Sequence, residues 1–451
     1  MKIIVTIMSF ALLLSASDVM NGSLKLEEAI DVLKSQNLEI KAASLQIEAA
    51  KADENSVQGM NWGKLDFTQD FSRSNDAGNV FGFKLTSREA SFGAFGFSEF
   101  DATNPNILNV QPQDLNYPDA RNFFQSKLKY EMPLFTGFAI SSYSDIMNKM
   151  TQMKTLEKDQ VVNEKIYQLR KSYYEMALLE ESITHLRTIL NNVNILEDAT
   201  QNMIEVGYAK KVDLLEVKAK KGNINRLLIE LNSNKKLLYH YLSFLLNQKI
   251  TSVTTPVSDI AAPSISDEEI LKNNVDVQKA STGLMIKNDM LKVSQAAYYP
   301  TVGAFAEVAT ADNSFLGNAT EHKGYTVGAR LTWNLFNGGI DSAKIEKSKI
   351  DRLETQSKAL LAKKGVALEL AKVRTEIESA DEEILSLKKE LVLADAIYEN
   401  YEGRYKEKLS SMSDVIIKQS AQIEKILQLQ VAKNKRNEKI FLLEKLANYK
   451  K

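Results

Sequence analysis

The sequence contains no cysteine, which excludes disulfide bonds, thiol catalysis, cysteine-ligated zinc and a lipid-modified N-terminal cysteine. Its three histidines, His185, His240 and His322, lie far apart without metal-ligand spacing, and we expect each at the surface or in ordinary packing. No glycine-rich phosphate-binding loop occurs, and the many carboxylates fall on exposed helix positions. The sequence therefore predicts no catalytic site, no metal site and no cofactor.

Proline is scarce, with seven in 451 residues, and none lies within 134–255 or 301–451. Because proline inside a helix removes a hydrogen bond and clashes with the preceding turn, both spans can be helical throughout. No charge of one sign dominates either, since 57 basic residues face 58 acidic ones and the net charge is −1. Without a basic excess, nucleic acid is not an expected partner.

Long apolar runs are absent outside the N-terminus. There Lys2, the apolar segment Ile3–Leu14 and the small residues Ser15–Ser17 predict a signal peptide over residues 1–17. A membrane anchor is the alternative, but about a dozen apolar residues is short for a span that needs roughly 20. Any further membrane contact must then use strands.

The chain repeats itself at an offset of 201 residues. Leu134–Gly137 (LFTG) returns as Leu335–Gly338 (LFNG), and Val212–Leu215 (VDLL) returns as Ser413–Ile416 (SDVI). Between these matches, apolar residues recur three and four apart in both copies, which is the spacing of a coiled-coil seam. The seam includes Leu169, Met176, Ile183, Leu186 and Val193 in the first copy and Leu370, Ile377, Ile384, Leu387 and Tyr398 in the second.

Two very long helices are predicted, from Ala139 to about Glu205 and from Ile340 to about Lys406. Each would be about 100 Å long at 1.5 Å per residue, so it must lie along similar helices in a bundle, a fibre or the wall of a tube. Four shorter helices are expected to stack end to end in pairs that match each long helix. They are Leu24–Met60, Asp213–Leu246, Asp267–Ala297 and Asp414–Asn448.

Alternating apolar and polar residues predict strands over Phe124–Leu134 and Tyr325–Leu335, with weaker partners at Leu65–Ser72 and Thr301–Thr310. Alternation fits either a soluble sheet on a core or a transmembrane barrel. We favour the barrel, because long helices bracket each strand pair and leave no separate core. Four strands cannot close a barrel, so the chain must oligomerise, and a dimer would supply eight strands and a trimer twelve.

These motifs resemble the TolC family of outer-membrane efflux channels over nearly the whole mature chain. The resemblance rests on Tyr298-Tyr299-Pro300, Pro133–Gly137, Leu335–Gly339, and Val206-Gly207 followed by Val212–Leu215. It implies a mainly α chain with a transmembrane β-barrel: a homotrimer with a twelve-stranded barrel in outer-membrane lipid and a coiled-coil helical tunnel through the periplasm. It also implies a passive duct, not an enzyme, that works with a periplasmic adaptor and an inner-membrane pump of the RND or ABC type.

The predicted organisation has a signal peptide (1–17), a first repeat (18–248), a linker (249–266) and a second repeat (267–451). The first strand pair carries a loop, about Ser74 to Asn122, that is 36 residues longer than its counterpart. This loop is either a variable surface loop or one whose phenylalanines fold over the channel mouth or pack on neighbouring loops.

The resemblance places an acidic periplasmic aperture at Asp414, with Asp213 and Glu216 as first-repeat equivalents. A second aspartate expected three residues after Asp414 is absent, because Ile417 stands there. Three chains would supply an acidic ring that favours cations. The local alternative is that Asp213 and Asp414 cap helix N-termini.

The resemblance also places adaptor docking at two turns, at Val206, Gly207 and Tyr208 and at Lys408 and Leu409. Lys408 replaces the glycine expected from Gly207, which argues against symmetric docking. The nearby lysines form either a basic surround or an ordinary solvated face. A periplasmic coiled-coil structural or adaptor protein, with its strands in a small soluble sheet, is the alternative function. The cargo, whether drug, metal or protein, cannot be derived from the sequence.

Overall fold

The computed structural model describes residues 23–256, 260–315, 317 and 320–448, so the predicted signal peptide lies outside the described residues. The chain divides into two compact units, each with segments of both repeats. The first unit, which we call the helical unit, comprises Met1–Glu48, Gln152–Thr282 and Gln356–Lys451. The second, which we call the sheet unit, comprises Ala49–Thr151 and Gly283–Thr355.

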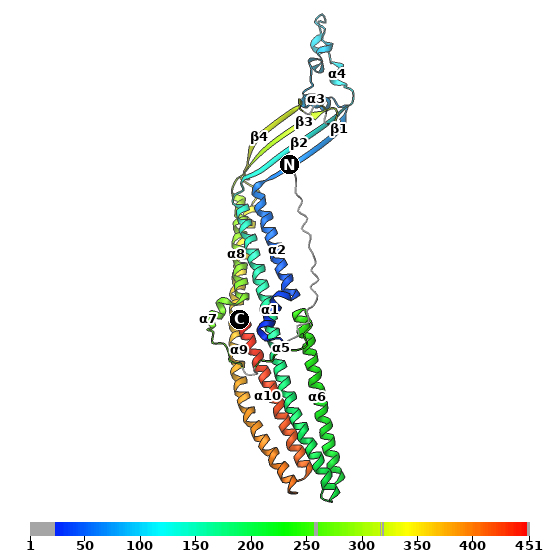
Figure 1. The fold of residues 1–451 in the computed structure, drawn as a ribbon. Coiled ribbons are helices and arrows are strands. Elements are labelled where there is room, and N and C mark those ends of the chain that lie inside the picture. Colours follow the sequence, from blue (N-terminus) through cyan, green and yellow to red (C-terminus); the bar gives the residue numbers. More distant parts are fainter. Residues whose placement is uncertain (1–22, 257–259, 316, 318–319, 449–451) are drawn as a thin grey trace. The chain divides into compact units, whose positions relative to one another are not determined.

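The two long helices, α5 (Ala139–Glu205) and α9 (Ile340–Lys406), each have 67 residues and begin and end 201 residues apart. Each is followed by a shorter antiparallel helix, α6 (Lys211–Leu246) after α5 and α10 (Met412–Leu446) after α9 (Figure 1). The prediction of both long helices is confirmed. Among the described helices, none is both long and apolar enough to cross a bilayer.

The cores of the helical unit follow the predicted seam. Leu169, Met176, Leu186 and Val193 of α5 are buried, as are Leu370 and Ile377 of α9. One cluster packs α5 and α6 against the N-terminal residues Leu24–Ile40, and a second joins α5, α6, α9 and α10. Because the second cluster draws on both repeats, the two helical hairpins share one apolar core.

Two of the shorter predicted helices are interrupted, which corrects the sequence analysis. Leu24–Met60 is broken into α1 (Leu26–Gln36) and α2 (Leu38–Gly59), followed by the short turn η1 (Met60–Trp62). Asp267–Ala297 is likewise broken into α7 (Asp267–Asn273) and α8 (Val275–Gln295), followed by η5 (Ala296–Tyr298). Each break is a single extended asparagine, Asn37 or Asn274, with ψ of 128°.

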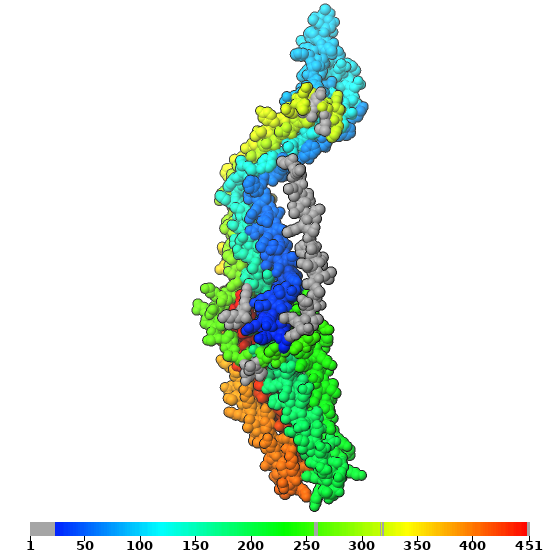
Figure 2. Space-filling view, viewed as in Figure 1, coloured from blue at the N-terminus to red at the C-terminus, as the bar shows by residue number. Residues whose placement is uncertain are grey.

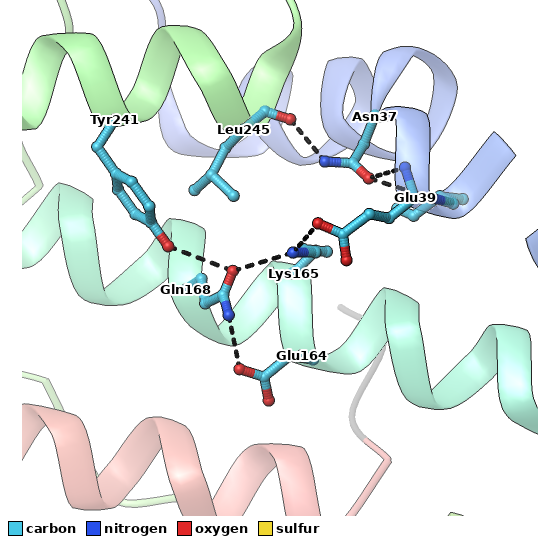
Figure 3. Close-up of polar contacts among 8 residues, drawn as sticks. Asn37, Glu39, Glu164, Lys165, Gln168, Tyr241 and Leu245 are labelled. Atoms are coloured by element: carbon cyan, nitrogen blue, oxygen red, sulfur yellow. Dashed lines mark hydrogen bonds and ion pairs between the residues drawn. The ribbon is translucent and has the colours of Figure 1, made fainter. Parts of the chain in front are cut away.

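The asparagine side chains explain these breaks. The Asn37 Oδ1 atom accepts hydrogen bonds from the backbone N–H groups of Glu39 (3.0 Å) and Ile40 (3.1 Å), which caps α2. Its Nδ2 atom donates to the carbonyl oxygen of Leu245 at 2.8 Å, near the end of α6 (Figure 3). Asn37 thus joins the start of one short helix to the end of another.

The second repeat has the same junction. Asn274 accepts from Asp276 and Val277 at 3.0 and 3.1 Å and donates to the carbonyl oxygen of Leu446 at 3.0 Å. Polar side chains surround the first junction: Lys165 Nζ contacts Glu39 Oε1 at 2.5 Å, and Tyr241 donates to Gln168 Oε1 at 3.2 Å (Figure 3). The predicted end-to-end stacking is therefore made by one asparagine in each repeat.

The linker lies against helices of both repeats. Val253 forms an isolated parallel bridge with Leu24, whose carbonyl oxygen also accepts from Tyr173 at 3.2 Å. Further along, Arg436 donates to the carbonyl oxygen of Ile260 and Arg374 to that of Ile265, each at 2.6 Å. The described part of the linker is thus held by backbone contacts to the helical unit.

The sheet unit contains a four-stranded antiparallel sheet in the order β1 (Lys64–Ser74), β2 (Arg121–Phe135), β3 (Thr301–Asp312) and β4 (Lys323–Thr332) (Figure 1). All four predicted strands are present. β4 ends at Thr332, however, and not at the predicted Leu335. Thr332 pairs with Thr301, and the residue before Thr301 is Pro300, which has no N–H group to extend the ladder.

The strand register collects apolar side chains on one face of the sheet. One row across the four strands is Phe67, Leu128, Val308 and Tyr325, and the next is Leu65, Tyr130, Ala306 and Val327. The opposite face carries rows such as Asp66, Lys129, Glu307 and Thr326. Phe67 is 68% exposed and Tyr325 82% exposed, so no described part of the chain covers the apolar face.

The long loop of the first hairpin is more ordered than a simple surface loop. It contains α3 (Ala77–Thr86), α4 (Gln113–Asn116) and the short turns η2 (Phe92–Phe95), η3 (Phe97–Glu99) and η4 (Ile107–Asn109). Phe83 stacks on Phe123 of β2 with 4.3 Å between ring centroids, and Phe81 meets Phe95 edge-on at 4.9 Å. In Figure 2 this loop is the light-blue segment at the top of the view.

Candidate functional site

The predicted docking residues lie at the two turns where a long helix passes into a shorter one. In the first turn, α5 ends at Glu205 and the backbone reverses at Gly207, whose φ is +76°. Tyr208 N–H then donates to the carbonyl oxygen of Met203 at 2.7 Å, and Ala209 N–H donates to the same oxygen at 3.2 Å. Glycine suits this position because it adopts positive φ without a steric penalty.

The second turn has the same backbone although its residue is not glycine. Lys408 has φ of +65°, and Leu409 N–H donates to the carbonyl oxygen of Arg404 at 2.7 Å. A left-handed conformation costs a non-glycine residue about 1–2 kcal/mol. The substitution of lysine for glycine therefore leaves the turn geometry intact and changes the side chain that the turn presents.

That side chain reaches the other turn. Lys408 Nζ lies 3.3 Å from the centroid of the Tyr208 ring, so an ammonium group of the second repeat rests on an aromatic face of the first. Lys406 instead pairs with Glu402 one helical turn earlier, at 3.0 Å. Lys408 is one of the lysines near the two turns, and its side chain makes a specific contact between the two tips.

The tips are otherwise apolar and exposed. Val206, Tyr208 and Leu409 are 65%, 66% and 68% exposed. Leu215 and Ile417, one turn into α6 and α10, are also exposed. Apolar side chains that no described residue covers at the end of a helical bundle form a surface suited to another protein.

The two aspartates cap helices, as the local alternative predicted. Asp213 Oδ2 accepts from Lys210 N–H at 2.8 Å at the start of α6. In the second repeat, Asp414 Oδ2 accepts from Ser411 N–H at 3.2 Å, and Ser411 Oγ accepts from Asp414 N–H at 3.2 Å, which completes a capping box. The hydrogen bonds from Ser411 hold the pKa of Asp414 below its ordinary value.

The structure places Glu216 on α6, one turn after Asp213, at a partly exposed position. In the described residues, Asp213, Glu216 and Asp414 share no hydrogen bond with one another. Their grouping into an aperture ring depends on copies of the chain and stays a prediction.

Directly behind the turns lies a core that the sequence analysis did not assign to the site. It contains Val193, Val217, Tyr405 and Met412 from all four helices. Thr200 and Tyr405, on the two long helices, share a buried hydrogen bond of 3.3 Å. The turns of the two repeats are therefore coupled through packed side chains and not only through Lys408.

Two further polar contacts cross this core. Lys220 of α6 donates to Ser420 Oγ of α10 at 2.7 Å, and burial lowers the pKa of its ammonium group. Gln419 donates to the Tyr398 hydroxyl at 3.3 Å, and burial raises the pKa of Tyr398 to about 12. The Lys220 ammonium group and the Tyr398 hydroxyl are both costly to bury without a hydrogen-bond partner. Their bonds to Ser420 and Gln419 therefore favour one arrangement of α6, α9 and α10.

Comparison with known proteins agrees with this architecture. Residues 268–437 match the family described as outer membrane efflux protein. No curated protein sequence matches the chain. Among solved structures, the chain is similar to CusC, in a study of folding and transmembrane channel formation, with a TM-score of 0.78 and 13% identity over 94% of this chain and 91% of CusC.

Two further solved structures, both of outer-membrane proteins, are similar to the chain. The match to VceC of Vibrio cholerae has a TM-score of 0.74 and 12% identity and covers 94% of this chain and 96% of VceC. The match to the open state of the MtrE outer membrane channel of Neisseria gonorrhoeae has a TM-score of 0.73 and 15% identity, covering 94% and 88%. Identities this low show the fold alone, and the family match covers residues 268–437.

The matching family is described as outer membrane efflux protein, and MtrE as an outer membrane channel. The second repeat is thus similar to the outer membrane efflux protein family over residues 268–437, and the chain as a whole has the fold of CusC and VceC.

Proposed function

We propose that the chain is one protomer of a homotrimeric outer-membrane duct, the passive exit of a tripartite efflux or type I secretion system. In this proposal a periplasmic adaptor and an inner-membrane pump, of the RND or ABC type, dock at the helical tips and open the duct. Transport energy comes from the pump, because the chain offers no nucleotide-binding loop of its own.

The observation that carries the proposal is the uncovered apolar face of the sheet. Its rows run across all four strands and include Phe67, Leu128, Val308 and Tyr325. Exposing apolar surface to water costs roughly 25 cal/mol per Å². An apolar face that spans four strands therefore needs lipid or a partner to cover it. The charged opposite face, with Lys129 and Glu307, suits an aqueous lumen.

The edges of the sheet support oligomer closure. In the described chain β1 and β4 each pair on one side only, so each leaves a row of backbone groups unpaired. Unpaired groups in hydrocarbon cost several kcal/mol each, and pairing β1 of one protomer with β4 of the next removes both edges. Three protomers give twelve strands, the number that the family resemblance implies.

The tips support docking. Val206, Tyr208 and Leu409 offer apolar surface at the two turns, and the Lys408–Tyr208 contact joins the turns within one protomer. An adaptor that covers these side chains would compete with this contact. The acidic ring of Asp213, Glu216 and Asp414 from three chains would then line the aperture and favour cations.

Disulfide trapping tests the closure directly, because the chain has no native cysteine. Phe71→Cys, near the end of β1 and on the same face as Tyr325, is combined in turn with Lys323→Cys, Tyr325→Cys and Val327→Cys at the start of β4. With antiparallel closure, at least one pair forms covalent dimers and trimers in isolated outer membranes. Phe71→Cys with Leu331→Cys, on the same face but at the far end of β4, is the matched control that stays monomeric.

The alternative function, a periplasmic coiled-coil structural or adaptor protein, predicts a different result. Such a protein is released from membranes by carbonate or salt washing and gives no β1–β4 cross-link with any pair. Retention in the membrane pellet together with a cross-linked trimer supports the duct. Release of the chain, or identical cross-linking by the control pair, contradicts it.

A further inference from the structure

Three side chains with metal-binding atoms meet at the loop end of the sheet unit. Glu89 follows α3 in the long loop, Asp312 is the last residue of β3, and His322 directly precedes β4. One ligand atom of each lies within 4.8 Å of the others. The cluster therefore draws on both strand hairpins, although its members are up to 233 residues apart in sequence.

The two carboxylates are oriented toward the imidazole. His322 Nδ1 lies 3.5 Å from Asp312 Oδ2 and 3.9 Å from Glu89 Oε1. The other oxygen of each carboxylate is held by a different donor: Asn313 N–H donates to Asp312 Oδ1 at 2.6 Å, and Arg121 pairs with Glu89 Oε2. Such outer partners commonly fix the orientation of carboxylates that bind a metal.

The imidazole nitrogen that faces the carboxylates is unsatisfied. His322 Nδ1 is buried and makes no hydrogen bond within the described part of the chain, and the side chain is only 12% exposed. A buried polar atom without a partner is rare in folded proteins and calls for an explanation such as an ion. Here that atom points at two carboxylate oxygens.

The spacing fits a small divalent cation. Zn²⁺ bonds of about 2.0–2.2 Å at tetrahedral angles separate ligand atoms by about 3.3–3.6 Å, close to the two separations from His322 Nδ1. One imidazole and two carboxylates form a donor set suited to Zn²⁺ and its transition-metal neighbours, whereas Ca²⁺ and Mg²⁺ prefer oxygen ligands alone.

We propose that Glu89, Asp312 and His322 form a divalent transition-metal site with Zn²⁺ as its representative ligand. The ion is held by Nδ1, Oε1 and Oδ2, and water completes its coordination. This site goes beyond the proposed duct function, because it joins the long loop of the first hairpin to the second hairpin. Loading it fixes the loop against the ends of β3 and β4.

Zinc titration of the full chain tests the site. The protein is extracted in detergent with a tag that lacks histidine, stripped with a chelator, dialysed and titrated with Zn²⁺ by calorimetry. We expect one ion per chain, loss of that binding in His322→Ala, and at least tenfold weaker binding in Glu89→Gln and Asp312→Asn. The matched controls are His185→Ala and His240→Ala, which remove the only other histidines and leave binding unchanged.

Co²⁺ provides a readout in the wild-type chain that does not depend on the folding of a variant. Bound Co²⁺ in a tetrahedral site with one nitrogen and two carboxylates gives strong visible absorption, which Zn²⁺ then displaces. Absence of this spectrum in the stripped wild-type protein, or equal Zn²⁺ stoichiometry in His322→Ala, overturns the proposal.

The titration is independent of the duct. A chain that binds Zn²⁺ at His322 but fails to cross-link β1 to β4 refutes the proposed function and keeps the metal site. A chain that cross-links as a trimer and binds no metal refutes only the site.

Discussion

Lys408 Nζ rests 3.3 Å from the centroid of the Tyr208 ring, although these residues occupy different repeats and lie 200 positions apart. The contact joins the turn between α5 and α6 to the turn between α9 and α10. It explains how lysine can stand where the first repeat has Gly207: the positive φ is retained, and the side chain gains an aromatic partner.

If this contact holds the tips together in the resting duct, Tyr208→Ala should favour the open state. An exposed cation–π pair contributes about 0.5–1 kcal/mol, which corresponds to roughly a two- to fivefold change in open probability in planar bilayers. Tyr208→Phe keeps the aromatic face and is expected to behave as wild type. Equal open probabilities for the alanine and phenylalanine variants would argue that the contact has no part in gating.

The capping box at the start of α10 predicts a local loss of stability. Ser411→Ala removes the acceptor for Asp414 N–H and should lower the free energy of unfolding by about 1 kcal/mol, as measured by denaturant titration in detergent. Ser413→Ala, two residues later on an exposed position, is the control. A loss of the same size in both variants would show that the cap is not responsible.

The acid sensitivity of this cap has a definite sign. The hydrogen bonds from Ser411 hold the pKa of Asp414 below its ordinary 3.8, so the folded chain binds this proton less readily than the unfolded chain. The stabilising contribution of ionised Asp414 is therefore present at pH values above the ordinary pKa. It is lost as the pH falls through the lowered pKa of the folded chain. Asp414→Asn should therefore reduce the dependence of stability on pH in this acidic range.

The asparagine junctions predict matched effects in both repeats. Asn37→Ala removes the cap of α2 and the bond to the Leu245 carbonyl, and Asn274→Ala does the same at Leu446. Each should lower the free energy of unfolding by about 1–3 kcal/mol, because a buried carbonyl oxygen loses its partner as well. Asn273→Ala, on the neighbouring exposed position, should change it little. A negligible effect of both junction variants would contradict the account of the helix breaks.

Alkaline pH should weaken the shared core through Tyr398. An unfolded tyrosine loses its proton near its ordinary pKa of 10, whereas burial raises the folded pKa of Tyr398 to about 12. Between these values the folded chain binds more protons, so stability falls as pH rises. In Tyr398→Phe this part of the decline, at most about 2.7 kcal/mol, should disappear from unfolding titrations at pH 9–12. An unchanged slope would place the phenol in a solvated environment.

The long helices could be predicted from the sequence because their determinants are local. The absence of proline and the unbroken apolar seam place the ends of α5 and α9 at Glu205 and Lys406, where the structure has them. The strands could also be predicted from alternation. The strand ends were less accurate: β2 begins three residues before the predicted Phe124, and β4 ends three residues before the predicted Leu335. The last pair of β4 depends on Pro300, which precedes the neighbouring strand β3.

The helix breaks at Asn37 and Asn274 were missed because the hydrogen bond that each asparagine makes across the fold reaches a distant helix. The carbonyl oxygen that Asn37 binds lies 208 residues away, so no local pattern shows it. A weaker signal was present: both repeats contain asparagine, an apolar residue and an acidic residue in succession, which is typical of a helix N-terminus. Comparing the repeats at this point would have predicted the breaks.

Among the residues of the candidate sites, some could be predicted from local sequence and others depend on contacts between distant parts of the chain. The caps at Asp213 and Asp414 follow from their places at helix starts, and that alternative was correct. The meeting of Glu89, Asp312 and His322 depends on strand pairing and on the path of a long loop, so sequence spacing carries no trace of it.

Single-particle imaging of the detergent-extracted full chain tests the central claim most directly. The account predicts a threefold particle in which β1 of each protomer pairs with β4 of the next, so that twelve strands close one barrel above a helical tunnel. A monomer, a twofold particle, or a particle in which β1 and β4 remain unpaired would contradict it.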